Sequence, residues 1–138
     1  MDLAPPRAEL RAAALRTVLD ATLPSEERLR PLYQSLDGRA FPVQLDDDAA
    51  RAVFDIGRGA EDAINRARAW DSLAVFRNTE FTPTLLADLA GHSAENVRAS
   101  AASALRPYVD DPAVRAALAQ AQDDPLISVR RAAQAALD

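Results

Sequence analysis

Apolar residues recur at intervals of three and four along most of the chain, the spacing that places them on one side of an α-helix. Within residues 7–21 this pattern is formed by Leu10, Ala14, Leu15, Val18 and Leu19. No run alternates Val, Ile, Thr or aromatic residues with polar ones, as a half-buried strand would. The pattern therefore predicts an all-α protein.

Breaks in the pattern divide the chain into about eight predicted helices. Pro, Gly or a capping Asp, Ser or Thr stands at most of the breaks, and these residue types begin or end helices. Pro31 lies inside the second predicted helix and should kink or split it. Most connections are short, which favours antiparallel neighbours. The predicted helices span about 7–21, 25–36, 49–57, 60–76, 83–90, 94–106, 112–121 and 125–138.

One stretch of sequence returns thirty-two residues later. AENVRASAASAL at 94–105 reappears as LISVRRAAQAAL at 126–137, and a weaker echo one period earlier includes Arg66, Ala69 and Leu73. Helical repeats at this period indicate a stacked array. The sequence therefore predicts three to four antiparallel helix pairs, with residues 46–138 as the array and residues 1–45 as a divergent N-terminal pair or cap.

DDPAVRAAL at 110–118 and LISVRRAAQAAL at 126–137 resemble HEAT-type repeats, most closely the short bacterial HEAT-like kind related to phycobilin lyase subunits. The resemblance implies an α-α superhelix, a HEAT-like α-solenoid, in which the second helix of each pair lines a concave surface. It also implies ion pairs between a turn Asp and the Arg of the following helix. Asp124 with Arg130 and Asp111 with Arg115 are the candidates, although both Asp residues are equally explained as N-caps.

Composition narrows the choice of partners. All 16 basic residues are Arg, and 21 acidic residues bring the net charge to -5, with a pI near 4.9. Nucleic acid is not expected as a partner, because the Arg residues are scattered and form no basic face. The chain has no Cys, no apolar stretch of membrane-spanning length and no signal-peptide pattern. We expect a cytoplasmic protein that does not contact the membrane.

The sequence contains no recognisable catalytic or metal-binding constellation. Some members of the resembled family ligate iron through His-Glu pairs, whereas this chain has a single histidine, His92, at a turn position equivalent to Asp124. A capping or solvent-facing role suits His92 better. The acidic run 46–48 precedes a predicted helix and fits an N-cap with helix-dipole partners better than a cation loop. We therefore expect no enzymatic activity, no metal and no cofactor.

Outward positions of the predicted second helices form the candidate protein-binding surface. Trp70 could anchor a partner there or fill space in the core, since its repeat equivalents, Ala102 and Gln134, differ in polarity. A groove with aromatic walls would favour a peptide or prosthetic group, whereas a charge-mixed face would favour a folded protein. The candidate residues are Arg68, Trp70, Asp71, Ser100, Ser103, Arg131 and Gln134.

The leading functional hypothesis is a non-enzymatic scaffold or adaptor that binds another protein on the concave surface. Two alternatives remain: an accessory or chaperone subunit of an enzyme, as in the lyase relatives, and a self-associating structural module. Uncapped repeat arrays are prone to associate. Three possibilities therefore stay open for the C-terminal repeat: it continues in a longer array, it forms a homodimer, or the eighth helix is already polar on its outer side, as Arg131, Gln134 and Asp138 allow.

Overall fold

The computed structural model describes residues 4–33, 35–36, 39–40 and 44–138. Within them the chain forms eight α-helices, as predicted, two short 3-10 helices and one small hairpin of two-residue strands. In order, these elements are α1 (Ala4–Leu19), α2 (Ser25–Tyr33), β1 (Ser35–Leu36), β2 (Arg39–Ala40), α3 (Asp47–Gly59), α4 (Ala63–Ser72), η1 (Thr79–Phe81), α5 (Thr82–Gly91), α6 (Glu95–Ala104), η2 (Arg106–Tyr108), α7 (Pro112–Ala121) and α8 (Ile127–Leu137).

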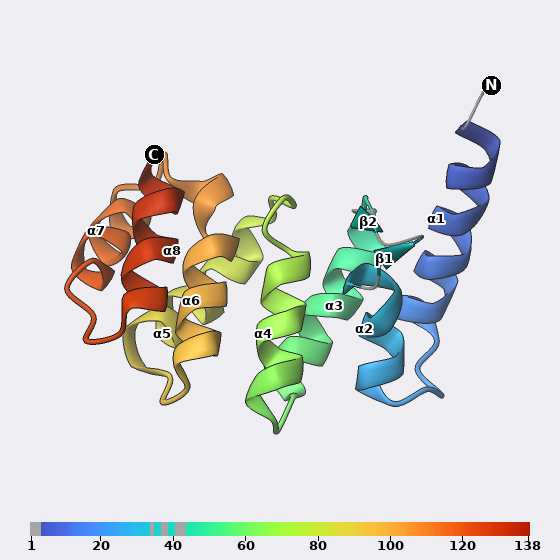
Figure 1. Ribbon diagram of the computed structural model, residues 1–138, viewed down its shortest axis with the longest axis horizontal. Coiled ribbons are helices and arrows are strands. Elements are labelled where there is room, and N and C mark those ends of the chain that lie inside the picture. Colours follow the sequence, from blue (N-terminus) through green and yellow to red (C-terminus); the bar gives the residue numbers. More distant parts are fainter. Residues whose placement is uncertain (1–3, 34, 37–38, 41–43) are drawn as a thin grey trace.

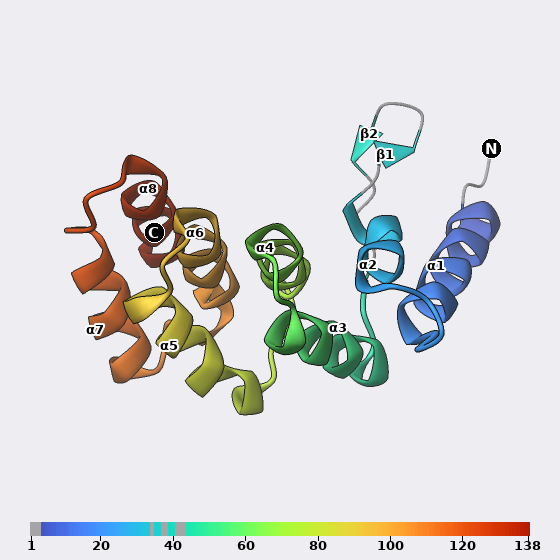
Figure 2. The ribbon, with the colours of Figure 1, turned by 90° about the horizontal axis from the view of Figure 1, so that it is seen from below.

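The eight helices form four pairs that stack side by side in two rows (Figure 1). The first helices, α1, α3, α5 and α7, make one row, and the second helices, α2, α4, α6 and α8, make the other. Figure 2 shows the first helices along a wider arc than the second helices. The second helices therefore line the inner side of the curve, and the architecture is the predicted α-α superhelix.

Equivalent repeat positions occupy equivalent places in the core between the rows. Val97 and Val129 are both fully buried, and so are Ala69, Ala101 and Ala133 one turn further along their helices. Alanine at this position lets neighbouring helices approach closely without leaving voids. The thirty-two-residue echo in the sequence thus reports a repeated packing arrangement.

The bounds of α2 and α4 differ from the predicted helix spans. α2 ends at Tyr33, three residues early, and it runs through Pro31 in its last turn without being split. β1 and β2 follow in antiparallel pairing; β1 replaces the end of the predicted second helix, and β2 lies where the sequence shows no helical spacing. Residues 37–38 between them lie outside the described part. α4 begins only at Ala63, because Asp62 is its N-cap and accepts a hydrogen bond from the Asn65 amide at 2.7 Å.

Tyr108, in the turn that follows α6, is tied to the connection between α4 and α5. Its side chain is buried, and its hydroxyl accepts a hydrogen bond from the Asn78 amide at 2.8 Å. The same hydroxyl donates toward the carbonyl oxygen of Asn78 at 3.0 Å. Burial raises the pKa of the Tyr108 hydroxyl, which therefore stays protonated. The second and third pairs are thus held together at this end of their helices.

Candidate functional site

The fourth residue of every second helix is an arginine. These arginines donate to backbone carbonyls at the end of the first helix in their own pair or in the turn that follows it, where the helix leaves carbonyls without a donor. Each therefore fastens the two helices of a pair together. The contacts are Arg28 Nε to Val18 O at 2.8 Å, Arg66 Nη1 to Gly57 O at 3.2 Å and Arg58 O at 3.0 Å, Arg98 Nη1 to His92 O at 2.8 Å and Ser93 O at 3.2 Å, and Arg130 Nη1 to Asp124 O at 2.8 Å and Pro125 O at 3.0 Å.

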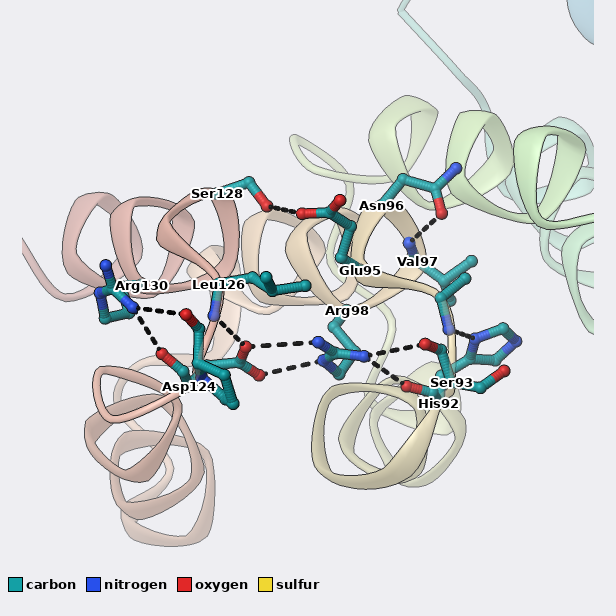
Figure 3. Close-up of polar contacts among 12 residues, drawn as sticks. His92, Ser93, Glu95, Asn96, Val97, Arg98, Asp124, Leu126, Ser128 and Arg130 are labelled. Atoms are coloured by element: carbon teal, nitrogen blue, oxygen red, sulfur yellow. Dashed lines mark hydrogen bonds and ion pairs between the residues drawn. The ribbon is translucent and has the colours of Figure 1, made fainter.

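Two of these arginines also join one pair to the next. Arg66 donates from Nε and Nη2 to the Asp88 carboxylate at 2.7 and 2.9 Å. Arg98 holds Asp124 in the same two-pronged way at 3.0 and 3.3 Å, as Figure 3 shows. All four side chains are at most 16% exposed. Bidentate pairs of this kind fix geometry as well as adding stability, so these inter-pair ion pairs set how consecutive repeats stack.

The predicted pairings of Asp124 with Arg130 and of Asp111 with Arg115 are wrong. The Asp124 carboxylate pairs with Arg98 of the preceding helix pair, while the described hydrogen bonds of Arg130 go to the backbone carbonyls of Asp124 and Pro125. Asp111 is the N-cap of α7 and accepts from the Ala113 amide at 2.9 Å. The geometry explains the error, because Arg66 and Arg98 use Nη1 on their own turn while their remaining nitrogens reach the following repeat.

Of the two roles considered for Trp70, a partner anchor and a core residue, the structure shows the core role. Its side chain is fully buried, and its Nε1 donates to Asp88 Oδ2 at 2.7 Å. The guanidinium of Arg66 lies 5.4 Å from the ring centroid. Trp70 therefore fills the space between two pairs and supplies a third hydrogen bond to a buried carboxylate. Ser100, another predicted surface residue, is only 7% exposed.

The other five predicted residues fall into two groups. Arg68 and Asp71 belong to α4 and Ser103 to α6, two neighbouring helices of the inner row, and Ser103 is partly covered. Arg131 and Gln134 are exposed on α8, but the equivalent positions in the preceding pair are Ala99, which is partly covered, and Ala102, which is fully buried. These two α8 residues therefore occupy the end flank of the stack, the side that a neighbouring pair covers in earlier repeats.

Sequence reasoning missed three residues that border the first group. Tyr33 is exposed at the end of α2, its ring centroid 4.2 Å from the guanidinium carbon of Arg68, and Arg68 Nη1 donates to its hydroxyl at 3.2 Å. Val75, which is 85% exposed, and Arg106 lie at a shallow depression of about 430 Å³ between α4, α6 and α8. Tyr33 carried no signal because α2 does not follow the thirty-two-residue offset. We define the inner face as Tyr33, Arg68, Asp71, Val75, Ser103 and Arg106.

Asp71 has the most perturbed chemistry on this face. Although the residue as a whole is exposed, its carboxylate is partly desolvated and is near Ser100 on the neighbouring helix α6. This desolvation raises the pKa of the Asp71 carboxyl, and a hydrogen bond from the Ser100 hydroxyl partly offsets the rise. A carboxylate that has lost part of its water gains more than usual from a nearby cation.

The remaining candidates for chemistry have structural roles. His92 Nδ1 accepts a hydrogen bond from the Ala94 amide at 3.1 Å, which confirms it as a turn-capping residue. Asp46 caps α3 by accepting from the Ala49 amide at 2.8 Å, as predicted. No three His, Asp or Glu side chains come together as a metal site among the residues described here. In the same part of the chain, no helix has the length and apolar character needed to cross a membrane.

A family model for HEAT repeats matches residues 50–138, well over half of the chain. The chain is a HEAT-repeat protein. The match runs from α3 to the end of α8 and leaves α1 and α2 outside it. HEAT repeats generally mediate protein–protein interaction, and their family is generally non-catalytic. No curated protein and no solved structure matches the chain.

Proposed function

We propose that this HEAT-repeat protein is a non-enzymatic scaffold or adaptor that binds a folded protein partner on its inner face. The observation that carries the proposal is the combination of the Tyr33–Arg68 stack with the partly desolvated carboxylate of Asp71 on the curved row of second helices. A cytoplasmic location is part of the same proposal and rests on the sequence features described first.

The Tyr33–Arg68 stack suits an anchor for a partner. Tyr and Arg are among the residue types that contribute most to binding at protein interfaces. Arg68 is already oriented by the Tyr33 ring and hydroxyl, so it loses less side-chain freedom when a partner binds. Asp71 lies one turn along α4 and offers the opposite charge. A partner surface with both an acidic and a basic group would complement this arrangement.

The inner face favours a folded protein over a peptide or prosthetic group. Its depression is shallow and is lined largely by small side chains, including Ala132, Ala135 and Ala136. Tyr33 is the one aromatic residue among the six that define the face. Sites for small ligands are usually deeper and lined by aromatic and larger apolar side chains. Broad, charge-mixed surfaces are typical of contacts between folded proteins.

The proposal is tested by locating the partner contact and then measuring its strength. A photo-crosslinking amino acid at position 103 should capture a partner from native lysate, whereas the same group at Arg16, an exposed residue of α1 in the outer row, should not. With the partner identified by mass spectrometry, calorimetry compares Arg68→Ala with the control Arg16→Ala. Arg68→Ala should weaken binding about tenfold or more, and Arg16→Ala should leave it unchanged.

Two results would contradict the proposal. Equal affinity of wild type and Arg68→Ala would remove the inner face from the interaction, and a loss confined to Arg16→Ala would place the contact on the outer row. Circular dichroism should show the same helical content for both variants, because Arg68 makes its contacts with Tyr33 on the surface.

A further inference from the structure

Arg130, in α8, has a binding edge that no described residue occupies. Its Nη1 holds two backbone carbonyls, as in the earlier repeats, but Nε and Nη2 have no acceptor among the residues that the structure describes. In Arg66 and Arg98 these two nitrogens bind a carboxylate of the following pair. Figure 3 shows Arg98 engaged on both sides and Arg130 engaged on one. The end flank thus presents two neighbouring donors, Nε and Nη2 of Arg130, which we call the fork, in position to bind a carboxylate.

The opposite end of the stack carries a matching carboxylate. Asp20 follows α1 directly and is exposed, and its Oδ1 accepts a hydrogen bond from the Thr22 amide at 3.0 Å. Asp124 makes the same local contact two residues ahead, with the Leu126 amide at 2.9 Å, and still has room for Arg98. No described arginine forms an ion pair with Asp20. Asp20 therefore lies after the first helix of its pair, and makes the same local hydrogen bond, as Asp124 does in the fourth pair.

Exposed apolar side chains accompany the charged groups in the two end pairs. Beside Arg130, Leu126 and Ile127 are 40% and 52% exposed. In α1, Leu10 and Leu19 are 43% and 46% exposed. The ion pairs between interior repeats are at most 16% exposed, and this shielding from water strengthens them. Both elements of an inter-repeat contact are thus available in these two pairs.

We propose that the protein self-associates head to tail, with Arg130 of one copy binding Asp20 of a second copy. The contact continues the series formed by Arg66 with Asp88 and Arg98 with Asp124 across a molecular boundary. A second copy is the favoured occupant, because the same chain supplies the fork at one end and the carboxylate at the other. Such a contact joins unlike surfaces, so it produces open chains whose length grows with concentration. It is separate from the inner face and independent of the function proposed for it.

Sedimentation velocity over a wide range of protein concentration tests this inference. The average mass of the wild type should rise with concentration. Arg130→Ala and Asp20→Asn should each weaken association about tenfold or more, since each removes one charge of the pair. An equimolar mixture of the two variants should form dimers and nothing larger, because it retains one intact fork and one intact carboxylate. Arg58→Ala, at an exposed arginine of α3 between the two end pairs, should associate like the wild type.

Several outcomes would overturn the inference. A wild type that stays monomeric at every concentration would remove self-association altogether. If Arg130→Ala abolished association while Asp20→Asn did not, the contact would be symmetric, between two C-terminal ends. Asp20→Asn keeps an oxygen to accept from the Thr22 amide, so its fold should persist. Arg130→Ala also loses the turn contacts of this arginine. If circular dichroism shows that it has unfolded, the result for Asp20→Asn alone decides whether the contact exists.

Discussion

At the scale of single residues, the most constrained group is the buried carboxylate of Asp88. It receives two hydrogen bonds from Arg66 and one from Trp70, all at 2.7 to 2.9 Å. A buried charge is stable only when donors satisfy it in this way. The sequence could not reveal this cluster, because the repeat equivalents of Asp88 and Trp70 are Gln120 and Ala102. An ion pair between consecutive helix pairs is present at both interfaces, but its carboxylate comes from a different repeat position in each, Asp88 in one and Asp124 in the other.

Gly57 makes the position of Trp70 possible. A Cβ atom at Gly57 would lie 2.8 Å from both the Ala69 Cβ and the Cζ3 atom of the Trp70 ring. Gly57→Ala should therefore lower the free energy of unfolding by about 1 to 3 kcal/mol, the usual cost of overpacking a core. Urea denaturation followed by circular dichroism measures the change.

Gly59 provides the matched control for this substitution. It ends the same helix, and a Cβ atom added there would meet no neighbouring atom within 4 Å. Gly59→Ala should be neutral or stabilising by up to about 1 kcal/mol, because alanine is the better helix former. Equal destabilisation by both substitutions would mean that contact with Trp70 does not explain the effect at Gly57.

At the scale of helices and pairs, the arginine at the fourth position of each second helix relates α2 to the later repeats. Successive members of the series lie 32 residues apart from Arg66 onward, whereas Arg28 precedes Arg66 by 38. A search at a fixed offset of 32 residues therefore does not align α2 with the later second helices. The shared contact with the end of the preceding helix supports the proposal that residues 1–45 contain a divergent member of the array.

The ion pair of Arg98 with Asp124 should contribute measurably to stability. Both side chains are at most 14% exposed, so removing either leaves a poorly solvated charge. Arg98→Ala should cost about 2 to 3 kcal/mol. A double-mutant cycle with Asp124→Asn should show coupling between the two residues. Arg77→Ala, which breaks the well-exposed pair with Asp110, should have a much smaller effect.

The same pair should make stability depend on pH. The hydrogen bonds from Arg98 and from the Leu126 amide lower the pKa of the Asp124 carboxyl in the folded protein. Its contribution is therefore complete above about pH 5 and is lost as the pH falls below about 4, through the lowered folded pKa. Asp124→Asn should flatten this part of the stability profile. An unchanged acid profile in the variant would show that other carboxylates determine it.

At the scale of the molecule, the sequence predicted the array because its signals are local and repeated. Proline, capping residues and the recurrence of Val97, Arg98 and Leu105 define helices and their stacking without reference to distant contacts. Contacts between pairs were not predictable in this way. The two inter-pair ion pairs span 22 and 26 residues, and one carboxylate comes from a helix while the other comes from a turn. No fixed spacing therefore marks them, and the inner face was only partly identified for the same reason.

Unequal links between pairs should produce unequal local stability along the stack. α4 and α6 each have neighbours on both sides, and ion pairs join the second pair to the third and the third to the fourth. α1 lies at one end with Leu10 and Leu19 exposed, and no described ion pair links Arg28 to the second pair. Repeat arrays gain stability mainly from such nearest-neighbour contacts.

Hydrogen exchange measured by mass spectrometry should therefore show the slowest exchange in α4 and α6 and the fastest in α1. Asp124→Asn should accelerate exchange in α7 and α8 more than in α3 and α4, because it weakens only the last interface. Uniform protection across all eight helices, with a uniform response to the substitution, would mean that the stack unfolds as one cooperative unit. In that case the ion pairs would add to global stability without dividing the molecule into separately unfolding pairs.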